Sequence, residues 1–491
     1  MSKNAEAVLL NGKKIEYVIN ENPPSGTMKH TYFSPDRSYV VQFYNDPKNA
    51  NDPNVRKRIE AIIGKYNPTL SEEKGGAKGN SEFTAEYFSK NFCWPRAIIE
   101  SPEFGIVCPA YPGNFFFTKE ASAQLELKGK DKKSSWFTSR NRRLLNASEL
   151  GDFRSMLKIA ISLARSIRRM HQAGLSHSDL SCNNVLIDPK TGTCIIIDID
   201  SLVVPGLFPP EVAGTQKYIA PEVYETMELA FDDPKRKLPC SATDLHAMAV
   251  LIYEYFFLRH PLMGPKIFSK ESPEKDDFLA FGPKAIFIEN PKDKSNRPKD
   301  LKVTVKDLGS VLESLFIRAF VDGLHNPELR PSAMDWERGL VKTWDMLQPC
   351  ENPKCTSKWF ILHDPKNPVC PFCGHKVGKN QFVRIQLKRQ MRGHSGTWCS
   401  AGEINAYDRL PLFGWHVFSD IFPDEKADRS MMAYVCKYQD KWFLVNHNIK
   451  GMISPGGNLV PAKQAVQLSN GVVFRMSNQD NGYLAEVVCD S

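Results

Sequence analysis

The sequence predicts an α+β protein with two lobes, followed by a small metal-binding module and an all-β domain. Three observations support this prediction. Residues 10–115 read as short strands with one helical interruption, whereas residues 148–345 are dominated by apolar residues at helical spacing. Four cysteines then cluster within residues 350–373. Finally, residues 380–491 contain β-type runs separated by turns rich in Asn and Gly.

Composition narrows the function classes. The chain has 491 residues, 42% of them apolar, which is enough for several hydrophobic cores. Its 64 Lys and Arg against 56 Asp and Glu give a net charge of +8, too dilute at this length to indicate a nucleic-acid partner. The first thirty residues contain no apolar run typical of a signal peptide, and no later stretch reaches the roughly eighteen uncharged residues that span a bilayer. We therefore expect a cytoplasmic protein without membrane contact.

The residues of catalytic character follow one amphipathic helix, expected over Ser148–Met170. After it come Asp179, Asn184 five positions later, and Asp198 behind the apolar run Cys194–Ile197. Phosphoryl transfer needs a carboxylate that orients the accepting hydroxyl and oxygen ligands for a divalent metal ion. The spacing therefore predicts Asp179 as the catalytic base, with Asn184 and Asp198 holding Mg²⁺ or Mn²⁺ and ATP as the phosphate donor.

Three later residues fit the same scheme. Glu222 and Arg330 could form a buried ion pair between two helical segments, and Asp244 could accept backbone N–H groups from the loop that carries Asp179. With these residues the chain resembles the protein kinase superfamily over residues 10–345. The resemblance implies a two-lobed protein kinase-like fold, with residues 10–115 as the N-terminal lobe and 116–345 as the helical C-terminal lobe.

The chain departs from the kinase pattern at three positions around the catalytic loop. Ser178 replaces the usual Arg before the catalytic Asp, so a phosphorylated activation loop would lack its cationic anchor. Ser181 replaces the Lys two residues after Asp179, which removes one cation for the γ-phosphate. Asp200 stands where a Gly normally follows the metal-binding Asp, which adds a carboxylate near the metal.

The largest departure concerns the phosphate-binding lysine, whose place in the third strand is taken by Gln42. A hairpin between Thr27–Phe33 and Ser38–Tyr44, joined by the loop 34–37, would place Lys29 directly opposite Gln42 on the same face. We therefore expect Lys29 to bind the phosphates, as in the kinases called with-no-lysine. The alternative is a surface lysine on a half-exposed strand.

Four further residues are candidates for the nucleotide site. Glu60 is expected to pair with Lys29, and its alternative is an exposed helix charge. Gly26 is the residue of its loop that lets the backbone approach phosphate. Pro109 and Tyr111 are expected in the connection between the lobes, next to the adenine, and their alternative role is structural packing.

Residues 348–378 contain Cys350, Cys355, Cys370 and Cys373, two thiolate pairs at the spacing of a Cys₄ zinc ribbon. Because the protein supplies four ligands, the zinc ion is expected to stabilise a small fold and to take no part in chemistry.

The tail at residues 380–491 is expected to form a small β-sandwich. Trp442–Asn446 and the run 464–474 are similar to the closing strands of forkhead-associated-like domains. The tail lacks the Ser-Arg-x-x-His pattern, so phosphopeptide binding is not expected. A structural or protein-docking β-domain is the simpler interpretation.

The whole arrangement resembles the bacterial kinases associated with tellurium-resistance (Ter) gene clusters. The segments that carry this likeness are Met28–Val41, His177–Ser181 and Ile197–Gly206, together with the ribbon and tail. The resemblance implies phosphorylation of protein Ser or Thr in a stress or defence response. It also implies two partners, a von Willebrand A-type protein and a metal-dependent protein phosphatase. Two alternatives remain: a pseudokinase scaffold that recruits partners, and a kinase for a small hydroxylated molecule.

Overall fold

The computed structural model divides the chain into two compact units. It describes residues 3–20, 29–46, 52–204, 207, 214–230, 232–378, 382–391 and 393–489. The first unit comprises Met1–Gly151, Ser162–Arg297 and Arg318–Ala333, and the second comprises Asp152–Ile161, Pro298–Ile317 and Met334–Ser491.

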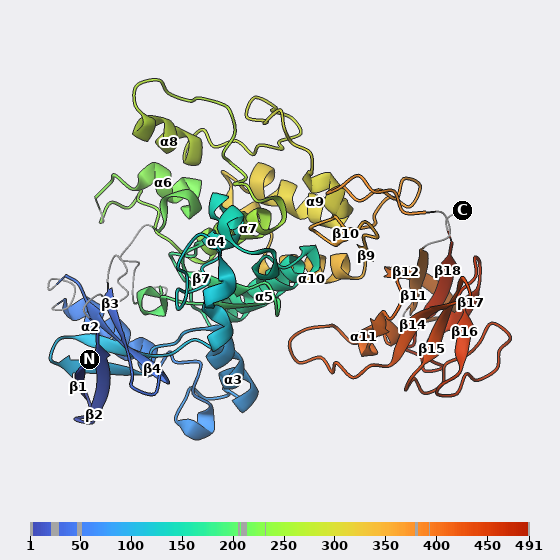
Figure 1. Ribbon diagram of the computed structural model, residues 1–491, viewed down its shortest axis with the longest axis horizontal. Coiled ribbons are helices and arrows are strands. Elements are labelled where there is room, and N and C mark those ends of the chain that lie inside the picture. Colours follow the sequence, from blue (N-terminus) through green and yellow to red (C-terminus); the bar gives the residue numbers. More distant parts are fainter. Residues whose placement is uncertain are drawn as a thin grey trace. The chain divides into compact units, whose positions relative to one another are not determined.

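The first unit begins with an antiparallel sheet at the blue end of the chain in Figure 1, where β1, β2, β3 and β4 are labelled. The sheet has six strands in the order β2-β1-β5-β6-β4-β3. Its strands are β1 Lys3–Leu9, β2 Lys14–Ile19, β3 Lys29–Phe33, β4 Tyr39–Tyr44, β5 Ala97–Ser101 and β6 Gly105–Pro109. Two helices, α2 Pro53–Ile63 and α3 Glu82–Asn91, lie between β4 and β5 in sequence. Strand β1 precedes the boundary expected at residue 10, so the sheet starts earlier than the sequence indicated.

The register of the β3–β4 hairpin differs from the expected one. Lys29 pairs with Tyr44, and Thr31, not Lys29, pairs with Gln42. The expected register was therefore wrong by two residues, because Ser34 pairs with Tyr39 and the turn is formed by residues 35–38, one residue later at each end than the expected loop. Since side chains alternate between faces with a period of two, a shift of two residues leaves Lys29 on the same face as Gln42.

The rest of the first unit is mainly helical. Its elements are α4 Ser135–Thr138, the C-terminal part of α5 Phe153–Gln172, the hairpin of β7 Val185–Asp188 and β8 Thr193–Ile196, α6 Pro221–Thr226, α7 Ser241–Phe257 and α8 Pro273–Phe281. Helix α5 confirms the helix expected from the apolar pattern, and Gly174 follows it with a φ of +74°. Helix α7 is buried on nearly all sides, as its apolar sequence requires.

Arg330 and Glu222 form the expected ion pair in this unit. The guanidinium donates to both carboxylate oxygens at 2.7 Å, and the Arg330 side chain is 1% exposed. Three carbonyl groups accept its remaining N–H groups, so the buried charge is fully paired. The pair ties α6 to the segment that follows the π-helix Arg318–Asp322.

The second unit contains α9 Gly309–Ile317, most of α10 Ala333–Trp344, and all the later strands. Strands β9 Leu347–Pro349 and β10 Trp359–Ile361 form a small hairpin. Two four-stranded sheets follow, ordered β12-β11-β18-β17 and β13-β14-β15-β16, with the short helix α11 Gly414–Val417 between β13 and β14. The strands are β11 Val383–Met391, β12 His394–Ala406, β13 Pro411–Leu412, β14 Ala433–Tyr438, β15 Lys441–Asn446, β16 Ala465–Gln467, β17 Val473–Arg475 and β18 Leu484–Val488.

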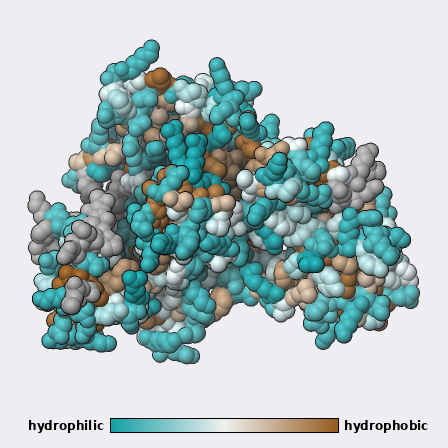
Figure 2. Space-filling model, in the orientation of Figure 1, coloured by the Kyte–Doolittle hydropathy of each residue, from teal (hydrophilic) through white to brown (hydrophobic). Residues whose placement is uncertain are grey.

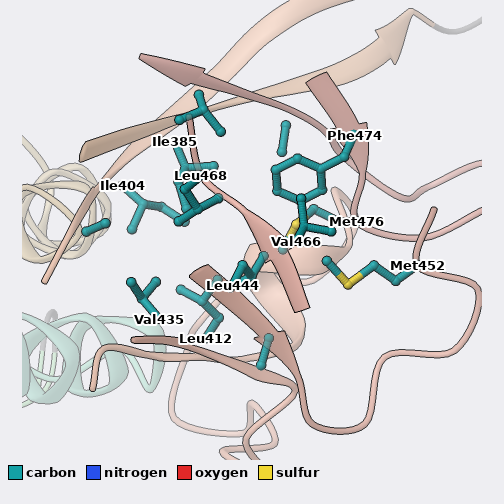
Figure 3. Close-up of a cluster of buried hydrophobic side chains, with 14 of the residues drawn as sticks. Ile385, Ile404, Leu412, Val435, Leu444, Met452, Val466, Leu468, Phe474 and Met476 are labelled. Atoms are coloured by element: carbon teal, nitrogen blue, oxygen red, sulfur yellow. The ribbon is translucent and has the colours of Figure 1, made fainter. Parts of the chain in front are cut away.

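The two sheets share one hydrophobic core. Ile385 and Phe474 from one sheet and Val435, Leu444 and Val466 from the other belong to the same buried cluster, and Figure 3 shows their side chains converging. Alternate residues of β11 and β15 are buried, which is the pattern of strands with one face on a core. The tail therefore consists of two packed antiparallel sheets, whereas its likeness to forkhead-associated domains stays a prediction.

The hairpin β9–β10 belongs to the same unit as the sheets. The buried Asn405 of β12 donates to the carbonyls of Met346 and Leu362, at 2.7 and 2.9 Å. The cysteine-rich segment and the β-sheets are thus joined by hydrogen bonds.

Hydrophilic residues dominate the face seen in Figure 2, with apolar residues scattered among them. Within the described part of the chain, no helix combines the length and apolarity needed to cross a membrane.

Candidate active site

A cleft of about 660 Å³ lies in the first unit, a volume typical of small-molecule sites. One part of its wall is apolar and includes Phe33, Val40 and Ile197. The remainder is polar and charged. The residues there are Lys29, Gln42, Lys130, Asp131, Lys133, Asp179, Asn183, Asn184, Asp198 and Thr215. The cleft thus brings Lys29, Asp179, Asn184 and Asp198 together, as the sequence predicted.

Asp179 is held by hydrogen bonds to both carboxylate oxygens. Thr215 donates its backbone N–H and its hydroxyl to Oδ1, each at 2.7 Å. Asn184 donates from Nδ2 to Oδ2 at 3.0 Å and to the backbone oxygen of Asp179 at 2.8 Å. Because Nδ2 of Asn184 is engaged in this way, its carbonyl Oδ1 is the atom suited to a cation.

Asp244 anchors the backbone of the loop that carries Asp179, as the sequence predicted. Its carboxylate accepts the N–H groups of His177 at 2.8 Å and Ser178 at 3.2 Å, and it lies 3.0 Å from Nε2 of His171. These bonds form a fixed support, because Asp244 is only 1% exposed. Ser178 adopts a left-handed conformation with a φ of +68°, which these contacts help to hold.

Lys29 bridges two carboxylates. Its ammonium lies 2.8 Å from Oδ1 of Asp198 and 2.5 Å from Oδ1 of Asp200. The hydroxyl of Tyr44 donates to the other oxygen of Asp200 at 2.6 Å. The Lys29 side chain is 9% exposed and that of Asp200 is 8%, whereas Asp198 is 38% exposed and lines the cleft.

Electrostatics keep Lys29 and Asp198 ionised. Burial disfavours the charge on Lys29, but Asp200 and Asp198 outweigh it and hold the pKa of Lys29 above its ordinary value. Lys29 in turn holds the pKa of Asp198 below its usual value, against the effect of burial. Asp198 is therefore a carboxylate at neutral pH.

The donor set suits a hard divalent cation. Asp198 and Asn184 offer a carboxylate and an amide oxygen, the ligand types that Mg²⁺ and Mn²⁺ prefer. Asp198 has a left-handed backbone with a φ of +63°, which costs on the order of 1 kcal/mol and is common where function requires it.

Glu60 does not pair with Lys29, which corrects the expectation from the sequence. Helix α2 buries Val55, Ile59 and Ile62, so Glu60 points elsewhere: its side chain is 45% exposed and lies 3.5 Å from Arg56. The carboxylate of Asp200 takes the place that Glu60 was expected to fill beside Lys29.

The remaining candidates have mixed outcomes. Tyr111 lines the cleft and stacks on Phe116, with ring centroids 5.5 Å apart. Pro109 ends strand β6, one residue before the cleft-lining Ala110. Gly26 lies outside the described residues.

Sequence reasoning missed several residues of this site. Tyr44 was not singled out, and Asp200 was noted only as an extra carboxylate near the metal. Lys130 and Lys133 were not among the expected site residues, yet both line the cleft. No periodicity in the sequence indicated these two lysines, since Lys132 between them contacts the buried carboxylates of Glu149 and Asp188 instead.

The four cysteines come together in the second unit. The sulfurs of Cys350 and Cys373 are 3.6 Å apart, those of Cys355 and Cys370 are 3.9 Å apart, and all four lie within 4.8 Å of one another. A tetrahedral zinc ion with Zn–S bonds of about 2.3 Å requires sulfurs about 3.8 Å apart. The cluster therefore fits a four-coordinate metal ion.

Comparison with known proteins supports a kinase assignment for part of the chain. Residues 133–335 match the family model of the protein kinase domain, and this region has a protein kinase-like fold. The anti-Muellerian hormone type-2 receptors of human and rabbit are 32% and 31% identical to this chain over 127 residues, which cover 21% of this chain and 22% of each receptor. The chain thus spans about a fifth of the length of the curated relatives it matches.

Solved structures similar to the chain include the kinase domain of a Toxoplasma gondii-specific rhoptry antigen and a rhoptry kinase from Toxoplasma gondii. Both are 12% identical, with TM-scores of 0.42. Each alignment covers 70% of this chain, and it covers 86% of the first structure and 84% of the second.

Proposed function

We propose that this chain is a protein serine/threonine kinase that uses ATP with Mg²⁺ or Mn²⁺. The observation that carries the proposal is the convergence of Lys29, Asp179, Asn184 and Asp198 in one cleft of about 660 Å³. Phosphoryl transfer is catalysed mainly by positioning and by charge stabilisation, and these residues offer both.

Each residue has a distinct role in the proposed reaction. Asp179, held by Thr215 and Asn184, orients the acceptor hydroxyl and takes its proton. Lys29 supplies a fixed positive charge for the phosphates. Asn184 and Asp198 would hold the metal ion, which, when bound, supplies charge neutralisation at the β- and γ-phosphates. The apolar wall with Val40 and Ile197 suits the adenine ring, and Tyr111 borders it.

Transfer of labelled γ-phosphate to a generic protein acceptor tests this proposal. The full-length wild type should transfer label in the presence of Mg²⁺, whereas Asp179→Asn, Asp198→Asn and Lys29→Met should each lose about a hundredfold or more. The exposed Glu86→Gln, whose carboxylate pairs with Lys90 one turn along α3, serves as a matched control. Equal activity in wild type and Asp179→Asn would contradict the proposal.

The acceptor class is tested by phosphoamino-acid analysis of the labelled product. Phosphoserine or phosphothreonine supports protein kinase activity. Label found only in a small hydroxylated compound would point to the metabolite kinase that the sequence leaves open.

A pseudokinase scaffold is the second candidate function. It is favoured by Ser181 in place of a lysine and by the pairing of Lys29 with two carboxylates, which compensate its charge. Nucleotide binding without label transfer, under conditions where a control kinase is active, would select the scaffold.

The cellular role proposed from the resemblance to Ter-associated kinases is stress or defence signalling in the bacterial cytoplasm. The partners proposed on the same ground are a von Willebrand A-type protein and a metal-dependent protein phosphatase. Binding of the purified full chain to each of these two proteins, measured by calorimetry, tests this context. Absence of binding to both would remove it without affecting the proposed chemistry.

A further inference from the structure

Asp200 differs from Asp198 in its surroundings. Both oxygens of Asp200 are engaged, Oδ1 by Lys29 and Oδ2 by the hydroxyl of Tyr44. Its side chain is 8% exposed, compared with 38% for Asp198. The carboxylate that faces the cleft is therefore Asp198, and the one enclosed by protein groups is Asp200.

A lysine that carries phosphate needs a partner that fixes its long side chain, because a free lysine side chain loses considerable rotamer entropy on binding. Glu60 of α2 does not supply this partner, since it is 45% exposed beside Arg56. Asp198 can supply it only while it is not engaged with a metal ion. Asp200 is buried beside Lys29, and it is not one of the proposed metal ligands.

The neighbouring strand completes the support for Lys29. Lys29 and Tyr44 are paired across β3 and β4, and the ammonium lies 5.7 Å from the centre of the Tyr44 ring. The same ring packs on Phe104 with centroids 5.6 Å apart, so its hydroxyl is directed by the core. Tyr44 thus contacts both members of the Lys29–Asp200 pair.

We propose that Asp200 is the positioning residue for Lys29 and that Tyr44 holds Asp200 in place. Asp200 would fix the Lys29 side chain, which is the role expected of Glu60. Asp198 would then be available to bind the metal ion. The catalytic part of this inference rests on the proposed kinase function, whereas the Lys29–Asp200–Tyr44 arrangement does not.

A double-mutant cycle on unfolding free energy tests the arrangement without any activity. Asp200→Asn should destabilise the wild type, because it removes a partner of the buried Lys29. In a Lys29→Met background it should stabilise the protein, because it then removes one of the two neighbouring negative charges that have lost the ammonium of Lys29. The opposite signs are the expected result. The same sign and size in both backgrounds would overturn the proposal.

The kinetic test separates positioning from metal binding. Asp200→Asn should lower kcat/KM for ATP at least tenfold, and Asp200→Glu should lower it less. In the Lys29→Met variant, adding Asp200→Asn should cause no further loss of kcat/KM. Tyr44→Phe should give a smaller loss in the same parameter, and Glu86→Gln should give none. A change in the Mg²⁺ dependence with unchanged KM for ATP would make Asp200 a metal ligand and overturn the proposal. A loss of the same size in Glu60→Gln would also overturn the proposal, because it would assign the positioning of Lys29 to Glu60 of helix α2.

If no variant, including the wild type, transfers phosphate, the kinase proposal fails and the unfolding cycle alone decides the arrangement. Opposite signs in that cycle would then show that the Lys29–Asp200 pair stabilises the fold but has no role in catalysis.

Discussion

Lys29 shows what a single residue can and cannot reveal. The absence of a lysine at Gln42 and the face of the hairpin pointed to Lys29 from the sequence alone, and the structure brings it to Asp198 in the cleft. Its other partner, Asp200, is 171 residues away in sequence. No local pattern indicates which of several carboxylates a lysine will meet, since that depends on how distant segments pack.

Glu254 provides a prediction about pH at the residue scale. Burial in α7 raises the pKa of Glu254 to about 7, although Tyr218, which donates a hydrogen bond at 2.6 Å, opposes the shift. The native state therefore binds a proton that the unfolded chain has lost between about pH 4.5 and 7. Stability from this group is present at low pH and is lost as the pH rises through that window.

Replacing Glu254 with Gln should remove this loss. The unfolding free energy of Glu254→Gln relative to wild type should rise by roughly 3 kcal/mol between pH 4.5 and 8. Urea unfolding at both pH values measures the difference, with the exposed Glu228→Gln as a control. A difference independent of pH would show that Glu254 titrates normally.

At the scale of elements, the β3–β4 hairpin and helix α5 illustrate two kinds of prediction. Helix α5 followed from its apolar spacing, because a period of 3.6 residues is set by local geometry. The register of the hairpin did not follow, because Asp36 accepts hydrogen bonds from Ser34 and Ser38 and shapes the turn. Turn residues of this kind fit several loop lengths, so the sequence left the register open.

The Glu222–Arg330 pair gives a prediction at this scale. Glu222→Gln leaves the buried guanidinium of Arg330 without a counter-charge, so it should lower the unfolding free energy by about 3–5 kcal/mol. Glu225→Gln, on the exposed side of the same helix, should change it by less than about 0.5 kcal/mol. Denaturant unfolding of the full chain measures both. Equal effects of the two substitutions would mean that the pair does not stabilise α6.

At the scale of the whole molecule, the compact units do not follow the order of the chain. The second unit combines the cysteine cluster and the β-sheets with the start of α5 and with α9. The sequence suggested separate domains at 348–378 and 380–491, because composition changes there. Hydrogen bonds such as those of Asn405 cross that boundary and do not alter composition.

The cysteine cluster yields the prediction at this scale. The purified chain should contain one zinc ion, and Cys370→Ser should lose it and destabilise the second unit, because structural zinc supplies on the order of 10 kcal/mol of folding free energy. Metal analysis and thermal unfolding measure the two effects. Cys399→Ser, which lies outside the cluster, should retain the zinc. A full zinc content in Cys370→Ser would contradict the four-cysteine site.

The sequence by itself determined the kinds of side chain available to this protein: three oxygen-bearing residues at kinase spacing, a lysine on the same hairpin face as Gln42, and two cysteine pairs. Spacing along the chain carries that information because short loops and regular elements fix local geometry. Only the tertiary structure decided that Asp200 and not Glu60 meets Lys29, that Tyr44 joins them, and that the cysteine cluster shares a unit with the sheets. Those outcomes depend on contacts between residues far apart in the chain, where packing and the pairing of buried charge select one partner among many.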